Sequence, residues 1–397
     1  MLIHWIWLSR LPQVTNRQKR MLLQVFRNPE DIYKATEDAF LSVGGLTEKN
    51  IVSLLDKDLS QARQILSDCN EKNIGILTYG DGAYPSKLKN IEQPPLVLYY
   101  KGCLPDWEMV PVIAMVGTRK ATAYGLNTAQ RVGFQIASCG ALVISGGANG
   151  IDSLALQGAM EAGKRVVAVL GCGADVVYPA KNKDLFGKIE KQGCILSEYV
   201  PGTPPYTWNF LQRNRIISGI SNGVLVVEAP ERSGALNTVK HAMEQGRDVF
   251  AVPGNVNNPS CAGSNQLLGA QALPAYTGWD VMREYAALYP DAVTRFEQPY
   301  PDTFRMEQTP VYPEPVEKVR NKSIDNREKS RYSVEDNQRK SLSEQERAVY
   351  DCLSITPKPV DEIIAALEMP AGKVLSILTV LAMKGLVKNH PGKLVSK

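Results

Sequence analysis

The sequence has few of the residues that metal and acid–base chemistry need. It has only three histidines, and none of them lies in a glycine-rich loop, so imidazole catalysis has no obvious carrier. Its seven cysteines form no CxxC pair and have no histidine at metal-ligand spacing. We therefore predict no metal site and no catalytic residue. An odd, unpatterned set of cysteines is typical of a reduced, cytoplasmic protein.

Long apolar runs and a strong charge of one sign are also missing. No stretch approaches the roughly 18 apolar residues that would span a bilayer. The apolar patch in MLIHWIWLSRLPQ lacks a basic region before it and a cleavage site after it, so we expect neither a membrane contact nor a signal peptide. The formal net charge of +4 permits a polyanionic partner without requiring one. At 397 residues and 44% hydrophobic content, the chain should form two or three domains.

What is present is a regular alternation of apolar runs, rich in β-branched residues, with helical patterns. Such alternation predicts an α/β fold with a Rossmann-like, doubly wound parallel sheet over residues 111–296. Ligands of these sheets bind at the carboxyl ends of the strands. The runs cover 112–116, 141–145, 165–170, 194–197, 223–228 and 248–252, and the helical patterns cover 124–138, 151–162 and 235–245.

Smaller modules are expected on both sides of this domain. Residues 1–73 indicate a small helical domain of the helix-hairpin-helix or SAM-like type. Its turn at Gly44 and Gly45 either docks a phosphate backbone or serves packing alone. Residues 74–110 are expected to form an extended connecting segment.

The last hundred residues should contain a tether and a second module. Residues 297–341 are rich in proline and charge, which predicts a flexible linker. Residues 342–397 indicate three helices and a hairpin turning at Pro391 and Gly392, a winged helix. Its third helix offers solvent only Lys373, Ser376, Thr379 and Lys384, so DNA binding and protein docking are equally open roles.

The loop after the first strand carries charge where a cofactor site would carry glycine. A dinucleotide-binding turn has the pattern GxGxxG, but this loop reads Gly117, Thr118, Arg119, Lys120. We therefore expect no cofactor, and an arginine placed to hold a phosphate. Alternatively, Arg119 pairs with Asp152.

Two further loops have features that suit phosphates. The loop at 146–150 contains Gly146, Gly147 and Asn149, and its amides can form an anion-binding nest or simply a tight turn. The loop after the fifth strand places Arg232, Ser233 and the amide of Gly234 at the start of a helix. Several phosphate-type loops on one sheet edge suit a polymer better than a small molecule.

The loop after the fourth strand mixes aromatic and basic residues. Tyr206, Trp208 and Phe210 precede Arg213, Asn214 and Arg215. Aromatic rings stack on exposed bases, while guanidinium groups follow the phosphates. This loop therefore predicts binding of single-stranded DNA. Trp208 and Phe210 could instead be core anchors, and we expect at least one of them to be so.

Several long motifs in register resemble the DNA-processing protein A (DprA/Smf) family. They are MVGTRKATAYG, ISGGANGIDSLAL, VLGCGADVVYPAKN, LSEYVPGTPP, RNRIISGISNGVLVVEAPERSGAL and VFAVPGN. The resemblance implies a cytoplasmic protein, not an enzyme, that binds and protects incoming single-stranded DNA. It further implies help in loading a RecA-type recombinase during natural transformation or homologous recombination, and a homodimer through the Rossmann-like domain. One departure is that Thr207 and Trp208 stand where some members have a lysine, which favours stacking over an added ion pair.

The residues and the resemblance together give one predicted site. The expected DNA-binding residues are Arg119, Lys120, Gly146, Gly147, Asn149, Trp208, Phe210, Arg213, Asn214, Arg215, Arg232, Ser233 and Gly234.

Two alternatives remain. One is a nucleotide-processing Rossmann-like enzyme, although the loop at 252–256 reads VPGNV where a PGGxGT-type signature would stand. In that case Asp152, Glu198 or Glu228 would be the candidate acids; lone carboxylates at strand ends more often orient arginines or cap helices. The other alternative is a transcription regulator whose winged helix reads duplex DNA.

Overall fold

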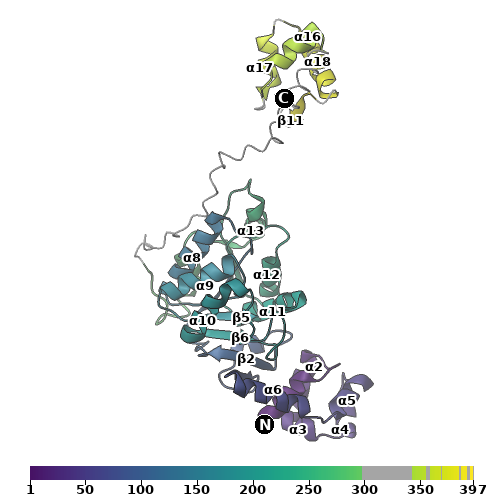
Figure 1. Ribbon diagram of the computed structural model, residues 1–397, viewed down its shortest axis with the longest axis vertical. Helices are drawn as coiled ribbons and strands as arrows, with labels where there is room; N and C mark the ends of the chain where they lie inside the picture. The colour runs from purple at the N-terminus through teal and green to yellow at the C-terminus, as the bar shows by residue number, and fades with distance from the viewer. Residues whose placement is uncertain (297–341, 355–357, 368, 384–385, 391–393, 397) are drawn as a thin grey trace, which may run out of the picture. The chain divides into compact units, whose positions relative to one another are not determined.

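The computed structural model describes residues 1–296, 342–354, 358–367, 369–383, 386–390 and 394–396. The chain forms two compact units, Met1–Glu307 and Gln308–Lys397 (Figure 1). The predicted linker, 297–341, lies outside the described residues.

The first unit is built on a nine-stranded sheet in which most neighbouring strands are parallel. The Rossmann-like, doubly wound fold is thereby confirmed. All six predicted runs form strands, because their alternate side chains are buried against helices on both faces of the sheet. The strands are β1 (Gly75–Thr78), β2 (Val97–Gly102), β3 (Val112–Val116), β4 (Leu142–Ser145), β5 (Val166–Leu170), β6 (Cys194–Ser197), β7 (Gly223–Val226), β8 (Asp248–Ala251) and β9 (Leu273–Pro274).

Helices cover both faces of this sheet. One face packs on α8 (Ala123–Ser138), α9 (Ile151–Glu161) and α10 (Lys183–Gln192). The other face packs on α11 (Thr207–Ile220) and α12 (Gly234–Glu244). Figure 1 shows these two groups on opposite sides of β5 and β6. The predicted helices at 124–138, 151–162 and 235–245 correspond to α8, α9 and α12.

The order of the strands creates a switch point between β3 and β7. The order is β1-β2-β6-β5-β4-β3-β7-β8-β9, so the chain runs from β3 outward to β6 and then returns to start β7 on the other side of β3. The loops after β3 and β7 therefore diverge to opposite faces. A crevice opens there, which is the usual ligand position in such sheets.

Two strands of the sheet come from the predicted connecting segment. β1 and β2 pair antiparallel with each other, and β2 pairs antiparallel with β6. The short helix α7 (Ser86–Lys89) lies between these two strands, so the segment is extended only in part, and it widens the sheet at one edge.

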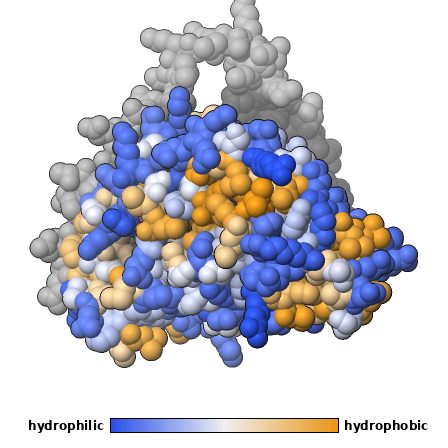
Figure 2. All heavy atoms as spheres, turned by 90° about the horizontal axis from the view of Figure 1, so that it is seen from below, coloured by the Kyte–Doolittle hydropathy of each residue, from blue (hydrophilic) through white to orange (hydrophobic). Residues whose placement is uncertain are grey.

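Six helices precede the sheet. Their apolar side chains share a hydrophobic cluster with one face of the sheet. Val25, Leu41 and Val52 remain exposed, and Figure 2, which views the molecule from this end, shows hydrophobic areas amid hydrophilic surface. The helices are α1 (Leu2–Arg10), α2 (Asn16–Phe26), α3 (Pro29–Lys34), α4 (Glu37–Leu41), α5 (Glu48–Leu55) and α6 (Ser60–Glu71).

The second unit has the three helices and the strands of a winged helix. Lys373 and Ser376 are exposed, whereas Lys384, the side chain of Thr379 and the predicted turn at Pro391 and Gly392 lie outside the described residues. The elements are α16 (Glu344–Cys352), β10 (Lys358–Pro359), α17 (Val360–Ala366), α18 (Ala371–Met383), β11 (Lys388–His390) and β12 (Leu394–Ser396).

Several features of composition can be checked on the described residues. All seven cysteines are free. No described helix is both long and apolar enough to cross a membrane.

The second unit has its own hydrophobic cluster, which makes its stability testable by itself. Leu381 on α18 is fully buried, whereas Leu375 on the same helix is 49% exposed. Leu381→Ala should lower the free energy of opening of α18 by about 2–5 kcal/mol, because it leaves a cavity. Leu375→Ala should change that free energy by about 0.5 kcal/mol or less. Hydrogen exchange read by mass spectrometry on the whole chain measures both, and equal effects would contradict the assigned core.

Candidate nucleic-acid interface

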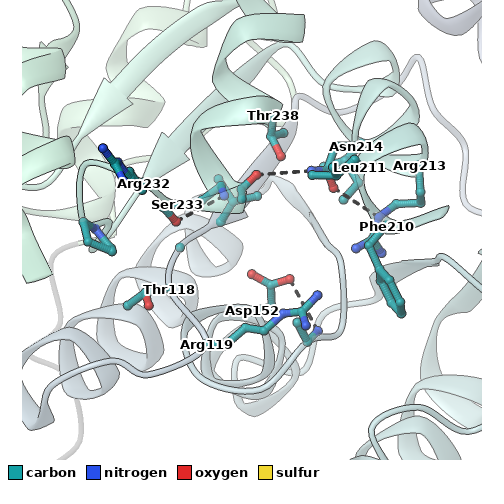
Figure 3. Close-up of a pocket in the computed structure, with 17 residues that line it drawn as sticks. Thr118, Arg119, Asp152, Phe210, Leu211, Arg213, Asn214, Arg232, Ser233 and Thr238 are labelled. Carbon is teal, nitrogen blue, oxygen red and sulfur yellow. Dashed lines mark hydrogen bonds between the residues drawn. The ribbon is translucent and has the colours of Figure 1, made fainter. Parts of the chain in front are cut away.

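A pocket of about 270 Å³ lies at the switch point (Figure 3). It is formed by the loop after β3, the loop between β7 and α12, the first half of α11, and part of the β4–α9 loop. We call it the switch-point pocket. Of the predicted site residues, it brings together Arg119, Phe210, Arg213, Asn214, Arg232, Ser233 and Gly234.

Arg119 lies over the ring of Phe210. Its guanidinium carbon is 5.2 Å from the ring centroid, and Figure 3 shows Arg119 beside Asp152, with Arg232 on the other side of the pocket. The side chain is exposed and makes no ion pair or hydrogen bond with any other described residue. Arg119 thus forms no ion pair with Asp152, although its charge lowers the pKa of that carboxyl group. A guanidinium with a ring face on one side and no ion pair remains available to a phosphate.

Arg232 is a second available cation on the opposite wall. It is exposed, and it has no ion pair or hydrogen bond within the described part of the chain. The next residue, Ser233, accepts a hydrogen bond from the Ala235 amide at 3.2 Å and so caps α12. The backbone at Gly234 is exposed. This helix start therefore offers a guanidinium and open backbone to an anion.

Arg213 also lines the pocket, but its guanidinium is committed to the fold. The side chain is 3% exposed, and Nη1 donates to the carbonyl oxygens of Gly146, at 2.9 Å, and of Val169. Burial lowers the pKa of Arg213 to about 10. Burial likewise raises the pKa of the neighbouring Asp152 above its usual value, and the charge of Arg213 opposes that rise. Arg213 therefore joins the ends of β4 and β5 to α11.

The glycines of the β4–α9 loop are explained by contacts within the protein. A Cβ at Gly146 would come within 2.6 Å of both Arg213 Nη2 and Asp152 Oδ2. Gly147 has a φ of 65° and lies against Phe186. Neither of these glycines lines the pocket, nor does Asn149, whose buried Oδ1 has no partner among the described residues.

The aromatic and basic segment after β6 is not a long loop. From Thr207 onward it is the helix α11, and the helical period places its side chains on two faces. Phe210, Arg213 and Asn214 face the switch-point pocket. Trp208 and Arg215 line a different hollow. The predicted patch is thus two separate surfaces.

The two aromatic residues differ in exposure. Trp208 is 66% exposed, so it is not a core anchor. Phe210 is half-buried: its ring lies against Gly171 and 5.4 Å from the ring of Tyr178. Phe210 is therefore anchored on one side and open to Arg119 on the other. Tyr178 is not among the predicted site residues, although it belongs to the motif VLGCGADVVYPAKN, which resembles the family.

The remaining charged residues are positioned as follows. Arg215 Nη2 donates to Glu198 Oε2 at 2.6 Å and to Oε1 at 2.8 Å, and Lys120 is exposed beside Arg119. Glu228 is fully buried and accepts hydrogen bonds from the amide and hydroxyl of Thr122, before α8. Glu198 thus orients an arginine, and Glu228 holds Thr122, the residue that caps α8.

Comparison with known proteins agrees with this architecture. The family model described as DNA recombination-mediator protein A matches residues 75–286. A model described as the DprA winged helix domain matches residues 335–393. The chain belongs to the DprA/Smf family.

Individual proteins of this family are also similar to the chain in sequence and in structure. Protein Smf of Synechocystis is 37% identical over 276 residues, which cover 68% of this chain and 69% of that protein. DNA processing protein DprA of Bacillus subtilis is 35% identical over 237 residues, or 60% of this chain and 78% of that protein.

The structure of DNA processing protein A from Streptococcus pneumoniae has a TM-score of 0.64 at 31% identity, covering 72% of this chain and 98% of that chain. The structure of DNA processing protein A from Helicobacter pylori has a TM-score of 0.50 at 27% identity, covering 54% of this chain and 97% of that chain.

Arg213, which is bonded within the fold, and Arg119, which is exposed, should contribute differently to the free energy of unfolding. Arg213→Met should lower the free energy of unfolding of the first unit by about 3 kcal/mol, because it leaves buried carbonyl oxygens and Asp152 without their cation. Arg119→Met removes an exposed side chain and should cost about 0.5 kcal/mol or less. Urea unfolding followed by circular dichroism measures both. A small loss for Arg213→Met would show that the buried guanidinium is dispensable.

Proposed function

We propose that this member of the DprA/Smf family binds single-stranded DNA in the switch-point pocket, and that it acts without catalysing a reaction. The observation that carries the proposal is the pair of available cations, Arg119 and Arg232, that line this pocket together with the half-buried ring of Phe210. Lys120 is exposed next to Arg119 but does not line the pocket. Guanidinium groups neutralise phosphates, and an aromatic ring stacks on a base.

A single strand suits this pocket better than a duplex. The bases of a duplex stack on one another and present no free ring face to Phe210, whereas every unpaired base presents one. The solved structure of the Helicobacter pylori relative is described as revealing its single-stranded DNA binding mode. That description supports the same class of ligand for this chain.

The proposed biological role is to protect incoming DNA and to help load a RecA-type recombinase during transformation or homologous recombination. Support comes from membership of a family described as recombination mediators. We further propose a homodimer through the Rossmann-like domain. The exposed Leu273 and Tyr276, at and beside the edge strand β9, and Met243 at the end of α12 offer apolar surface for such an interface.

The enzyme alternative has less support from the candidate acids. Glu228 accepts hydrogen bonds from Thr122, and Glu198 accepts hydrogen bonds from Arg215 and Asn16. Asp152 is buried and accepts a hydrogen bond from the Ala148 amide at 3.4 Å. Each carboxylate therefore has a structural partner.

Removing one available arginine should weaken binding in a salt-dependent way. For Arg119→Ala and for Arg232→Ala, we expect the slope of log affinity against log salt to fall by about 0.7, because one phosphate contact is lost. Fluorescence anisotropy with a labelled oligothymidylate at several salt concentrations measures this slope. Arg165→Ala is the matched control, since Arg165 is exposed just before β5, at the opposite end of the strands.

Unchanged slopes for both Arg119→Ala and Arg232→Ala would overturn the assignment of these loops. Preference for a defined duplex over the oligothymidylate would overturn the proposal itself and favour the winged-helix regulator.

Phe210 should contribute stacking rather than charge. Phe210→Ala is expected to lower affinity by about 1–3 kcal/mol while leaving the salt slope unchanged, because stacking releases few counterions. Phe210→Tyr keeps the ring and should retain most of the affinity in the same titration. If Phe210→Ala folds and binds as tightly as the unaltered chain, the ring serves packing alone.

A further inference from the structure

A second recess lies beside α11, on the side away from the switch-point pocket. It consists of two adjoining hollows of about 520 and 650 Å³, between the N-terminal helices on one side and residues 92–99 and α11 on the other, and both hollows reach Thr15 and Gln93. Their linings contain four arginines and two glutamates. We call the two hollows together the seam groove.

The seam groove carries a positive charge, and some of its arginines have no partner within the described part of the chain. Arg10 and Arg17 are exposed, and neither has an ion pair or hydrogen bond to another residue in the described ranges. Glu198 is already neutralised by Arg215 at 2.6 Å. The free charges on this wall are therefore mainly guanidinium groups, which favour an anionic ligand.

Buried polar groups on the same wall lack partners. Tyr99 is 1% exposed, and its hydroxyl has no hydrogen-bond partner among the described residues. The Nε and Nη1 atoms of Arg215 are buried and unpartnered in the same way. Both residues line the smaller hollow. Buried donors are normally satisfied, so these enclosed groups make the wall behind the hollow polar, while the exposed Arg10 and Arg17 are the groups that a ligand can reach.

The N-terminal end of α11 connects the seam groove with the switch-point pocket. No side chain caps this helix at Tyr206. The Asn209 amide donates to the Tyr206 carbonyl oxygen at 3.0 Å, which leaves the amides of Thr207 and Trp208 for a phosphate. Phe210 lines the pocket on one face of the helix, while Trp208, 66% exposed, lines the groove on the other. A strand stacked on Phe210 can cross the helix end and stack again on Trp208.

The far end of the seam groove reaches the glycine turn of the N-terminal helices. Gly45, between α4 and α5, lines the larger hollow together with Arg17 and Arg20. Its neighbour Gly44 is exposed, and no other group lies within 4 Å of where its Cβ would stand. Open backbone at a turn beside two arginines is a suitable contact for a phosphodiester.

From these observations we infer that the seam groove is a second binding segment for the same single strand, with the N-terminal helices holding its phosphates through Arg10 and Arg17. This inference rests on the proposed function, because the strand enters the groove from the switch-point pocket. The ligand is the sugar–phosphate backbone, and Trp208 receives one base.

The test compares two lengths of oligothymidylate on the full chain, one of about six nucleotides that fills only the switch-point pocket and one of about 20 that reaches the seam groove. The double variant Arg10→Ala/Arg17→Ala should bind the short one normally. It should bind the long one about 25-fold more weakly at 0.1 M salt, with a salt slope lower by about 1.4. Arg63→Ala/Arg165→Ala loses the same charge from exposed sites outside both pockets and should bind both lengths normally.

The outcomes separate the two proposals. If Arg119→Ala weakens binding of both lengths but the Arg10/Arg17 variant binds the long one normally, the inference is overturned and the proposed function stands. Equal weakening by the Arg63/Arg165 control also overturns it, since general charge would then explain the effect. If the unaltered chain binds neither length, both proposals fail. Circular dichroism confirms that each variant is folded, as expected for exposed side chains.

Discussion

The structure around the candidate site depends on one buried guanidinium. Arg213 extends from α11 under the switch point and donates to the carbonyl oxygens at the ends of two strands, at Gly146 and Val169. A buried cation with these partners fixes the rotation of the helix that carries it, since any turn of α11 would leave buried carbonyl oxygens unpaired. That rotation decides which side chains of α11 face the crevice. Phe210 faces it, and Trp208 does not.

The same guanidinium explains the composition of the β4–α9 loop. The space that a side chain at residue 146 would occupy is already filled by Arg213 and Asp152. Glycine there serves the internal ion network, and no ligand is needed to account for it. The network in turn supplies a rigid floor, above which Arg119 and Arg232 stand exposed. A committed arginine below and available arginines above perform different tasks, although all three follow strand ends in the sequence.

This difference between buried and exposed arginines could not be predicted from the sequence, whereas much of the fold could. The six central strands were predictable because buried parallel strands are continuous apolar runs. The strands β1 and β2 were less evident, since glycine, proline and polar residues surround them. The sequence predicts a loop where α11 lies, because Pro204 and Pro205 precede the helix and because its first turns are aromatic and polar rather than amphipathic. Its residues divide between two pockets, so no single apolar stripe marks it as a helix.

Which arginines are buried could not be predicted from the sequence either. Arg119, Arg213, Arg215 and Arg232 carry the same chemistry in the sequence, and tertiary packing alone separates them. Arg213 is enclosed by the ends of β4 and β5, and Arg215 is held by Glu198. The resemblance to the DprA/Smf family points to this region of the chain without making that distinction.

A helix that presents different faces to two recesses suits a polymer ligand better than a small one. A small molecule needs one enclosed pocket with converging groups, whereas a flexible strand can bend over a helix end and contact both sides. The start of α11 meets this condition, because it is uncapped and has an aromatic residue near it on each face. Cations continue beyond it, to Arg232 on one side and to Arg10 and Arg17 on the other. The rotation set by Arg213 thus does more than order the crevice: it places Phe210 and Trp208 in different recesses, as the proposed path of one strand requires.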